Sequence, residues 1–203
     1  MITGVLGAVA QWDVRRILSF HIISQIGYMM MGLAIATPAA IAAAVFYVVH
    51  HIIVKANLFF IAGAIERAGG SYDLRQTGGL MKSHPALAAL FLIPALSLAG
   101  LPPFSGFWAK VLVIDASFQG GNMWLGAVAL VVGLLTLLSM SKIWLGAFWK
   151  PAPEPRRHVH IPMAMLAPIA GLGAITVAIG LMAQPLVTYS QQTAAELSDR
   201  ERY

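Results

Sequence analysis

Three ionisable side chains stand together in an otherwise apolar stretch. The run HHIIVKANLFF carries His50, His51 and Lys55, near the middle of an apolar segment at 39–65. His51 lies four residues before Lys55, so a helix would place both on one face, whereas His50 points about 100° away and is available for a different contact. A lysine held away from water gives up its proton more readily, and histidine titrates near neutral pH. The spacing predicts a proton relay, or else hydrogen bonds to neighbouring helices.

A fourth basic residue follows a break in the next apolar segment. LSLAGLPPFSGFWAK ends on Lys110. It contains four residues expected to interrupt a helix, Gly100, Pro102, Pro103 and Gly106. Consecutive prolines remove backbone donors and clash with the preceding turn. Broken helices at membrane depth recur at the ion sites of transporters. Lys110 is therefore expected to load or release a proton at this break. The alternative is a kink that only shapes packing, with Lys110 reaching the interface.

One polar helix face is a further candidate. His21, Ser24, Gln25 and Tyr28 recur at helical spacing in the segment 18–37. His21 either extends the proton path or takes part in the interhelical hydrogen bonds that such polar residues commonly form in membranes.

Lys142 has two interpretations of its own. It lies about two turns before Trp149 and close to Trp144 and Lys150. Aromatic and basic side chains gather where a helix leaves the bilayer, so Lys142 either belongs to the buried basic set or extends to the interface.

The absence of certain residue types limits which ions and cofactors this chain is expected to bind. No Asp or Glu lies near the middle of any apolar segment, and there is no cysteine. Sodium and other hard cations prefer several oxygen ligands, above all carboxylates. No glycine-rich phosphate loop or nucleotide fingerprint is present. We expect proton conduction with any sodium site elsewhere, and no metal ion or cofactor bound by this chain.

The elements that must position these residues are membrane-spanning helices. Of the 203 residues, 59% are hydrophobic and 10% charged, and the mean hydropathy is +0.77, whereas soluble domains carry about 25% charged residues. The composition predicts an all-α polytopic membrane protein with one transmembrane domain over 1–195 and a polar tail at 196–203. Apolar runs predict five full spans at about 18–37, 39–65, 85–115 (broken at 100–106), 123–149 and 161–187.

The first ten residues are apolar but too short to cross a bilayer. They predict the end of a helix whose beginning is missing.

Basic residues alternate between the connections. Three connections carry them: Arg15 and Arg16; Arg67, Arg75 and Lys82; Lys150, Arg156 and Arg157. The connections near 37–38 and at 116–122 carry none, and the tail balances Arg200 and Arg202 with acids. The positive-inside rule predicts cytoplasmic basic loops and an external C-terminus. Membrane topology thus accounts for the net charge of +5, and no nucleic-acid partner is expected.

Several strings together resemble a known family. DVRRILSFHIISQIGY, HHIIVKANLFFIAG, the GGL after a glycine-rich loop, LIPALSLAGLPPFSGFWAK and SMSKIW resemble the D-type subunits of the Mrp multisubunit Na⁺/H⁺ antiporters, which are related to the antiporter-like subunits of respiratory complex I and membrane-bound hydrogenases. The resemblance runs from residue 1 to about 150. Two features favour the D-type antiporter subunits over the complex I relatives: the paired His50 and His51 with Lys55, and the lysine at 110, where some of those relatives carry a glutamate.

The resemblance implies a larger fold of two inverted repeats, each with one discontinuous helix, of which this chain is similar to the second repeat plus a final helix. It implies that Lys110 is the lysine of the broken helix, and that Lys55 with His51 belongs to a central hydrophilic axis. Repulsion between the two lysine charges would couple their protonation. The implied partners are other Mrp subunits in a hetero-oligomeric complex of the bacterial cell membrane, with protons and Na⁺ as the ions.

Two alternatives remain open at this point. The same helices would serve a redox-driven pump subunit of the complex I or hydrogenase class, which neighbouring genes would reveal. The other alternative is a fragment that does not transport ions. The reading frame upstream of Met1 would distinguish a truncated gene, a late start or a split subunit.

Overall fold

The computed structural model describes residues 1–152 and 159–198, and the regular elements of this part of the chain are all helices. Arg156 and Arg157 of the predicted basic loop lie outside the described residues, as do Arg200 and Arg202 of the tail. The helices are α1 (Ile2–Ala10), α2 (Val14–Ile35), α3 (Pro38–Gly69), α4 (Leu80–Ser83), α5 (Pro85–Ala99), α6 (Ser105–Gln119), α7 (Met123–Ile143) with its π-helical continuation η1 (Trp144–Trp149), α8 (Met163–Leu181) and α9 (Gln184–Ser198).

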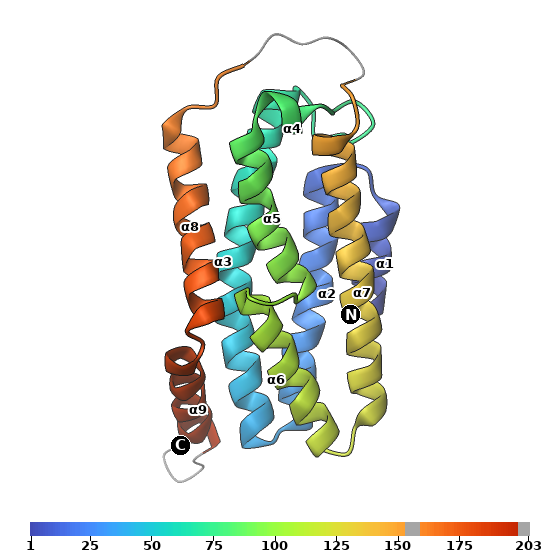
Figure 1. Ribbon diagram of the computed structural model, residues 1–203. Helices are drawn as coiled ribbons and strands as arrows, with labels where there is room; N and C mark the ends of the chain where they lie inside the picture. Colours follow the sequence, from blue (N-terminus) through green and yellow to red (C-terminus); the bar gives the residue numbers. More distant parts are fainter. Residues whose placement is uncertain (153–158, 199–203) are drawn as a thin grey trace.

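The long helices run side by side along one axis, and α5 and α6 follow each other end to end (Figure 1). Four helices of the described residues are long and apolar enough to cross a membrane, namely α2, α3, α7 with η1, and α8. At 15 residues each, α5 and α6 extend about 22 Å and only together match a bilayer. The predicted span 85–115 therefore consists of two half-helices.

Helix ends differ from the apolar limits for identifiable reasons. α2 begins at Val14, before the apolar run, because the Asp13 side chain accepts hydrogen bonds from the N–H groups of Arg15 and Arg16. In place of one predicted span at 161–187, the structure has α8 and α9, which are separated between Leu181 and Gln184. Pro185 disfavours helical geometry at the residue before it, which fits a new helix starting there. Residues 196–198 of the predicted tail belong to α9.

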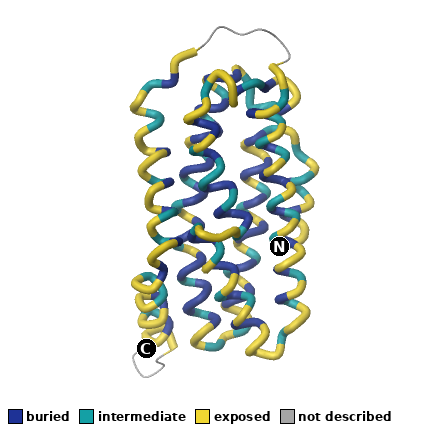
Figure 2. The backbone as a smooth tube through the Cα atoms, viewed as in Figure 1, coloured by how far each residue is buried: buried dark blue, intermediate teal, exposed yellow. Residues whose placement is uncertain are grey.

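α3 lies at the centre of the bundle, and Figure 2 shows it buried along most of its length. It packs against α2, α5, α6, α8 and α9. Large apolar side chains on the outer helix faces are exposed, among them Met30, Leu134 and Leu138. These faces suit a hydrocarbon environment rather than water.

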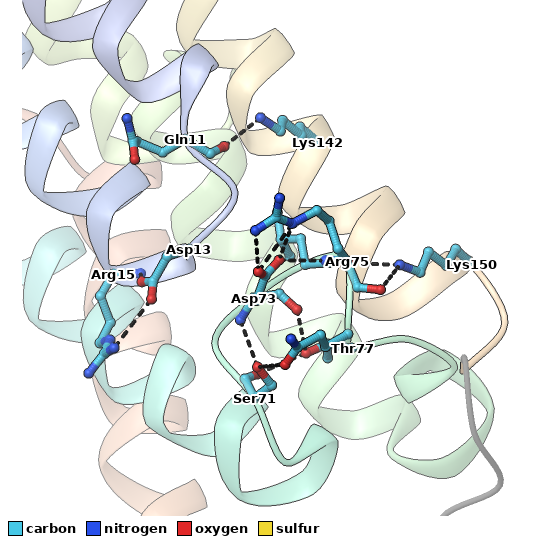
Figure 3. A network of polar contacts seen from close by, with 11 residues as sticks. Gln11, Asp13, Arg15, Ser71, Asp73, Arg75, Thr77, Lys142 and Lys150 are labelled. Atoms are coloured by element: carbon cyan, nitrogen blue, oxygen red, sulfur yellow. Dashed lines mark hydrogen bonds and ion pairs between the residues drawn. The ribbon is translucent and has the colours of Figure 1, made fainter.

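The connections that carry Arg15, Arg75 and Lys150 lie close together (Figure 3), at the end of the bundle where α4 lies (Figure 1), and we call this the basic end. Asp13 and Asp73 form an isolated β-bridge that joins the α1–α2 connection to the loop after α3. Arg75 forms an ion pair of 2.6 Å with Asp73, and this guanidinium lowers the pKa of the Asp73 carboxyl. Lys150 donates to the carbonyls of Leu74 and Arg75. The last described residues, at the end of α9, lie at the opposite end of the bundle (Figure 1).

Candidate functional site

The break between α5 and α6 is built by three of the four predicted residues. Gly100 ends α5 with φ +92, a left-handed conformation that favours glycine. A Cβ at Gly100 would lie 2.6 Å from the Cδ atom of Lys110. Pro102 and Pro103 follow and are joined by a cis peptide bond. The break thus brings the end of α5 directly against the side chain of Lys110.

Gly106 has a different role from the one predicted. It lies inside α6, in the first turn, and not between the half-helices. A Cβ there would lie 1.7 Å from the carbonyl oxygen of Ser97 and 2.9 Å from Cε1 of His50. Gly106 is therefore the point of closest approach of α6 to α5 and α3, where only a hydrogen atom fits.

Lys110 is 7% exposed, and its Nζ donates to the carbonyl oxygen of Ala99 at 2.7 Å. This carbonyl is one of the unpaired acceptors at the C-terminal end of α5, where the helix dipole favours a positive charge. Nζ also lies 5.5 Å from the ring centre of Tyr28. Asp115, the nearest acid along the sequence, is exposed and accepts a hydrogen bond from Gln119. Lys110 is held by a carbonyl and an aromatic ring instead of a carboxylate.

His50 belongs to the break. Its Nδ1 lies 2.8 Å from Oγ of Ser105, which lies 3.2 Å from Oγ of Ser97. Ser97 Oγ in turn accepts from the N–H of Gly106 at 3.1 Å. Helical spacing predicts no particular contact for His50 and does not point to the two serines. Their only signal was a small hydroxyl residue inside each half-helix.

Lys55 and His51 lie on the side of α3 that meets α2. Lys55 is 5% exposed, and its Nζ donates to the carbonyl oxygen of Leu18 at 3.0 Å. His51 is buried on the same face, as its spacing predicts. In the part of the chain that the structure describes, the ion pairs join Arg15 to Asp13 and Arg75 to Asp73. Both pairs lie at the basic end and are formed by arginines. Neither buried lysine is therefore part of these ion pairs.

His21 is fully buried on α2. Its Nε2 lies 3.0 Å from Oγ of Ser139 on α7, which is an interhelical hydrogen bond of the kind that the sequence predicted as one alternative. Buried side-chain atoms without a hydrogen-bond partner among the described residues are His21 Nδ1, Ser24 Oγ, Gln25 Nε2, His51 Nε2 and both polar atoms of Asn57.

Lys142 connects α7 to α1. Its Nζ donates to the carbonyls of Val9 at 2.8 Å and Gln11 at 2.5 Å, and lies 4.1 Å from the ring centre of Trp12. Figure 3 shows the contact with Gln11. These carbonyls are the free acceptors at the end of α1. Lys142 therefore caps a helix at the basic end, a contact that local spacing does not predict.

This cap leads to a prediction about stability. Replacing Lys142 with methionine is expected to lower the stability of the assembled protein by about 1–3 kcal/mol, because two carbonyls at the end of α1 lose their donor. The pH dependence of transport should not move. Thermal unfolding of the purified protein, measured beside the pH profile, checks both points, and a shifted profile with unchanged stability would contradict them.

A cavity of about 470 Å³ opens beside Lys110 between α6 and α7. Its walls are mostly apolar side chains, and Gly133 of α7 faces the ammonium, so that a Cβ there would lie 3.5 Å from Nζ. The described residues contain no group of three or more His, Asp or Glu that could hold a metal ion. The arrangement suits proton exchange at isolated cations.

Comparisons with known proteins agree on one family. The family model described as NADH:quinone oxidoreductase/Mrp antiporter, TM, matches residues 1–137. Over its full length the chain is 51% identical to the D-type subunit of a Na⁺/H⁺ antiporter of Alkalihalophilus pseudofirmus, and 34% identical to that of Bacillus subtilis. It spans 41% of the length of each of these relatives.

Solved structures share the fold. A chain in the structure of the Mrp complex from a Dietzia species superposes with a TM-score of 0.88 at 39% identity, over 97% of this chain and 45% of that one. A chain of respiratory complex I from Thermus thermophilus superposes with a TM-score of 0.81 over 95% of this chain and 42% of that one. Its identity is 24%, so this likeness shows the fold alone.

Proposed function

This chain belongs to the NADH:quinone oxidoreductase/Mrp antiporter transmembrane family, and on that basis we propose that it conducts protons within a multisubunit Na⁺/H⁺ antiporter. The observation that carries the proposal is the pair of buried lysines. Lys110 and Lys55 each donate to a backbone carbonyl, and neither takes part in the ion pairs of the described residues. A buried charge without a counter-ion is costly, and such residues in membrane segments mark ion pathways and proton relays.

In this mechanism Lys110 loads or releases a proton at the helix break. His50, bonded to Ser105, lies beside the break, and His51 and Lys55 exchange the proton with the centre of the bundle. His21 is buried on α2 and, in this mechanism, passes a proton between the two groups. Buried polar groups normally bind a partner or an ordered water, so the unpartnered atoms of Ser24, Gln25 and His51 are the expected water sites along the path.

The orientation and the partners are part of the same proposal. The basic end faces the cytoplasm of a bacterial cell, because short loops rich in Lys and Arg stay on that side. The C-terminal end of α9 then lies outside. The other subunits of an Mrp-type antiporter are the partners, in line with the relatives of 51% and 34% identity. The Na⁺ path lies outside this chain, because no carboxylate is buried among the described residues.

A redox-driven complex is the second candidate, because the matching family model is described for NADH:quinone oxidoreductase as well as for Mrp antiporters. There the same helices would move protons at the expense of electron transfer. Genes for quinone reductase or hydrogenase subunits beside this one would favour that candidate, and genes for small antiporter subunits would favour the first.

Changing Lys55 tests the relay. In a complete antiporter complex, Lys55→Ala is expected to reduce Na⁺-driven proton movement in everted vesicles by about tenfold or more, because an exchangeable proton carrier is lost. Subunit levels should stay near normal, since removing a buried charge also removes its cost of desolvation.

Lys142→Ala is the matched control for antiport at equal subunit level, because it removes a lysine that caps a helix away from the path. Equal activity of Lys55→Ala and the unchanged protein, at equal subunit levels, would contradict the relay.

A further inference from the structure

Two stacked tyrosines lie between His50 and Lys110. Tyr28 of α2 and Tyr47 of α3 are fully buried, and their ring centres are 5.3 Å apart at an interplanar angle of 14°. The ammonium of Lys110 lies 5.5 Å from the Tyr28 ring centre. The ring centres of Tyr47 and His50 are 5.7 Å apart, and the two rings are nearly perpendicular, at 88°. The two basic groups of the break are thus joined by an aromatic bridge.

Both rings are fixed by their hydroxyl groups. The Tyr28 hydroxyl donates to the carbonyl oxygen of Ala129 on α7 at 2.5 Å. The Tyr47 hydroxyl donates to Oε1 of Gln25 on α2. Two aromatic rings that are held at both ends and buried on all sides can fix the position of a neighbouring cation. The pair connects α2, α3 and α7 at the level of the break.

An ammonium group has three N–H donors, and Lys110 uses one of them on the Ala99 carbonyl. The face of an aromatic ring carries negative electrostatic potential and attracts a cation within about 6 Å, more strongly when water is excluded. The Tyr28 ring meets both conditions. It therefore stabilises the protonated side chain at a place where no carboxylate ion pair of the described residues does so.

We propose that Tyr28 and Tyr47 are positioning residues for Lys110: Tyr28 holds the charged ammonium at the end of α5 through its ring face, and Tyr47 supports that ring. This inference rests on the proposed function, because it assigns the proton exchange of the break to Lys110. It adds two residues that do not themselves carry the proton. They set where the ammonium lies and how readily it releases its proton.

Few other titratable groups surround Lys110 in the described part of the chain. α2 contributes Tyr28 and, further away, His21. α3 contributes Tyr47 and His50.

The other neighbouring helices bring no charge close to Lys110 among the described residues. α5 and α7 present the Ala99 carbonyl and Gly133. On α6, Asp115 is exposed and bonded to Gln119. A change at the Tyr28 ring should therefore act on Lys110 without a compensating carboxylate.

The test varies the electrostatic character of the ring while keeping its shape. In the complete antiporter complex, Tyr28→Phe keeps the ring face, and phenylalanines with increasing fluorine substitution at position 28 weaken it stepwise. We expect the pH of half-maximal antiport to fall step by step with fluorination, by about half to one unit over the series. Tyr28→Leu, which lacks the ring, should shift the profile at least as far.

Two controls separate this proposal from its premise. Tyr72→Leu removes a ring of the same kind, since Arg15 lies 3.8 Å above the Tyr72 ring at the basic end, and its pH profile should match the unchanged protein. Lys110→Ala tests the proposed function itself. If Lys110→Ala is inactive but the profile does not depend on fluorination at 28, the positioning role is overturned and the proposed function stands. If Lys110→Ala is fully active, the proposed function fails first.

Tyr47→Leu provides an independent test of the pair. It leaves the Tyr28 ring in the chain but removes the ring on which it stacks. A shift to lower pH, smaller than that of Tyr28→Leu, is expected. A profile identical to that of the unchanged protein, at equal subunit level, would overturn the role of Tyr47.

Discussion

Lys110→Ala is expected to reduce antiport of the complete complex by about tenfold or more, with the complex still assembled. The change removes the exchangeable proton at the break. It also leaves the Ala99 carbonyl without its 2.7 Å donor, which costs about 1–3 kcal/mol. The loss of a desolvated charge offsets part of that cost, because no carboxylate partner is left behind. Na⁺-dependent proton movement in everted vesicles, normalised to the subunit level, measures the effect.

Lys110→Arg distinguishes proton exchange from a fixed charge. Arginine keeps a positive side chain but does not release its proton in proteins. If Lys110 acts by exchanging a proton, Lys110→Arg should be as inactive as Lys110→Ala. Full activity of the arginine variant would mean that the break needs only a cation. Unchanged antiport in Lys110→Ala would refute the role assigned to this residue.

Gly106→Ala is expected to be the most disruptive small substitution near the break. The new Cβ would lie 1.7 Å from the backbone oxygen of Ser97. Moving the backbone of a packed half-helix away from this contact costs free energy. Overpacking of this kind costs about 3 kcal/mol. Separation of α6 from α5 would also break the bonds of Ser97 to Gly106 and Ser105, so antiport should fall together with stability.

Gly63→Ala and Gly171→Ala are the matched controls, because a Cβ at either position meets nothing within 4 Å. Alanine is the better helix former by about 1 kcal/mol, so these variants should be as stable as the unchanged protein or more so. Thermal unfolding of the purified complex compares the three variants. A Gly106→Ala complex that unfolds at the same temperature as the Gly63→Ala complex would rule out the tight approach at this glycine.

Local patterns were sufficient for the central helix and for the position of the break. The apolar run around His51 and Lys55 predicts a buried helix because such length and composition suit the bilayer, and α3 is that helix. Pro102 and Pro103 predict an interruption because proline removes a donor and clashes with the turn before it, and α5 ends at Ala99. The four-residue spacing likewise places His51 and Lys55 on one face, since helical geometry follows from the sequence positions alone.

Contacts between helices were beyond such patterns. The contact of His50 with Ser105 joins residues 55 positions apart, and that of Lys142 with Val9 spans 133 positions. Neither partner is encoded in local spacing, because it depends on how the helices pack. For this reason Lys142 proved to cap α1, and Gly106 proved to be a close approach and not a helix breaker.

The sequence by itself determined which bases lie in apolar helices and where one helix is interrupted, because hydropathy, spacing and proline geometry act over a few residues. It did not determine the end of the last span, which the structure divides into α8 and α9. Only the tertiary structure decided which group each base meets. Lys110 meets the end of α5 and the Tyr28 ring, and His50 meets the serines of the break. The physical reason is that a buried polar atom finds its partner across a helix interface, whose register is set by the packing of the whole bundle.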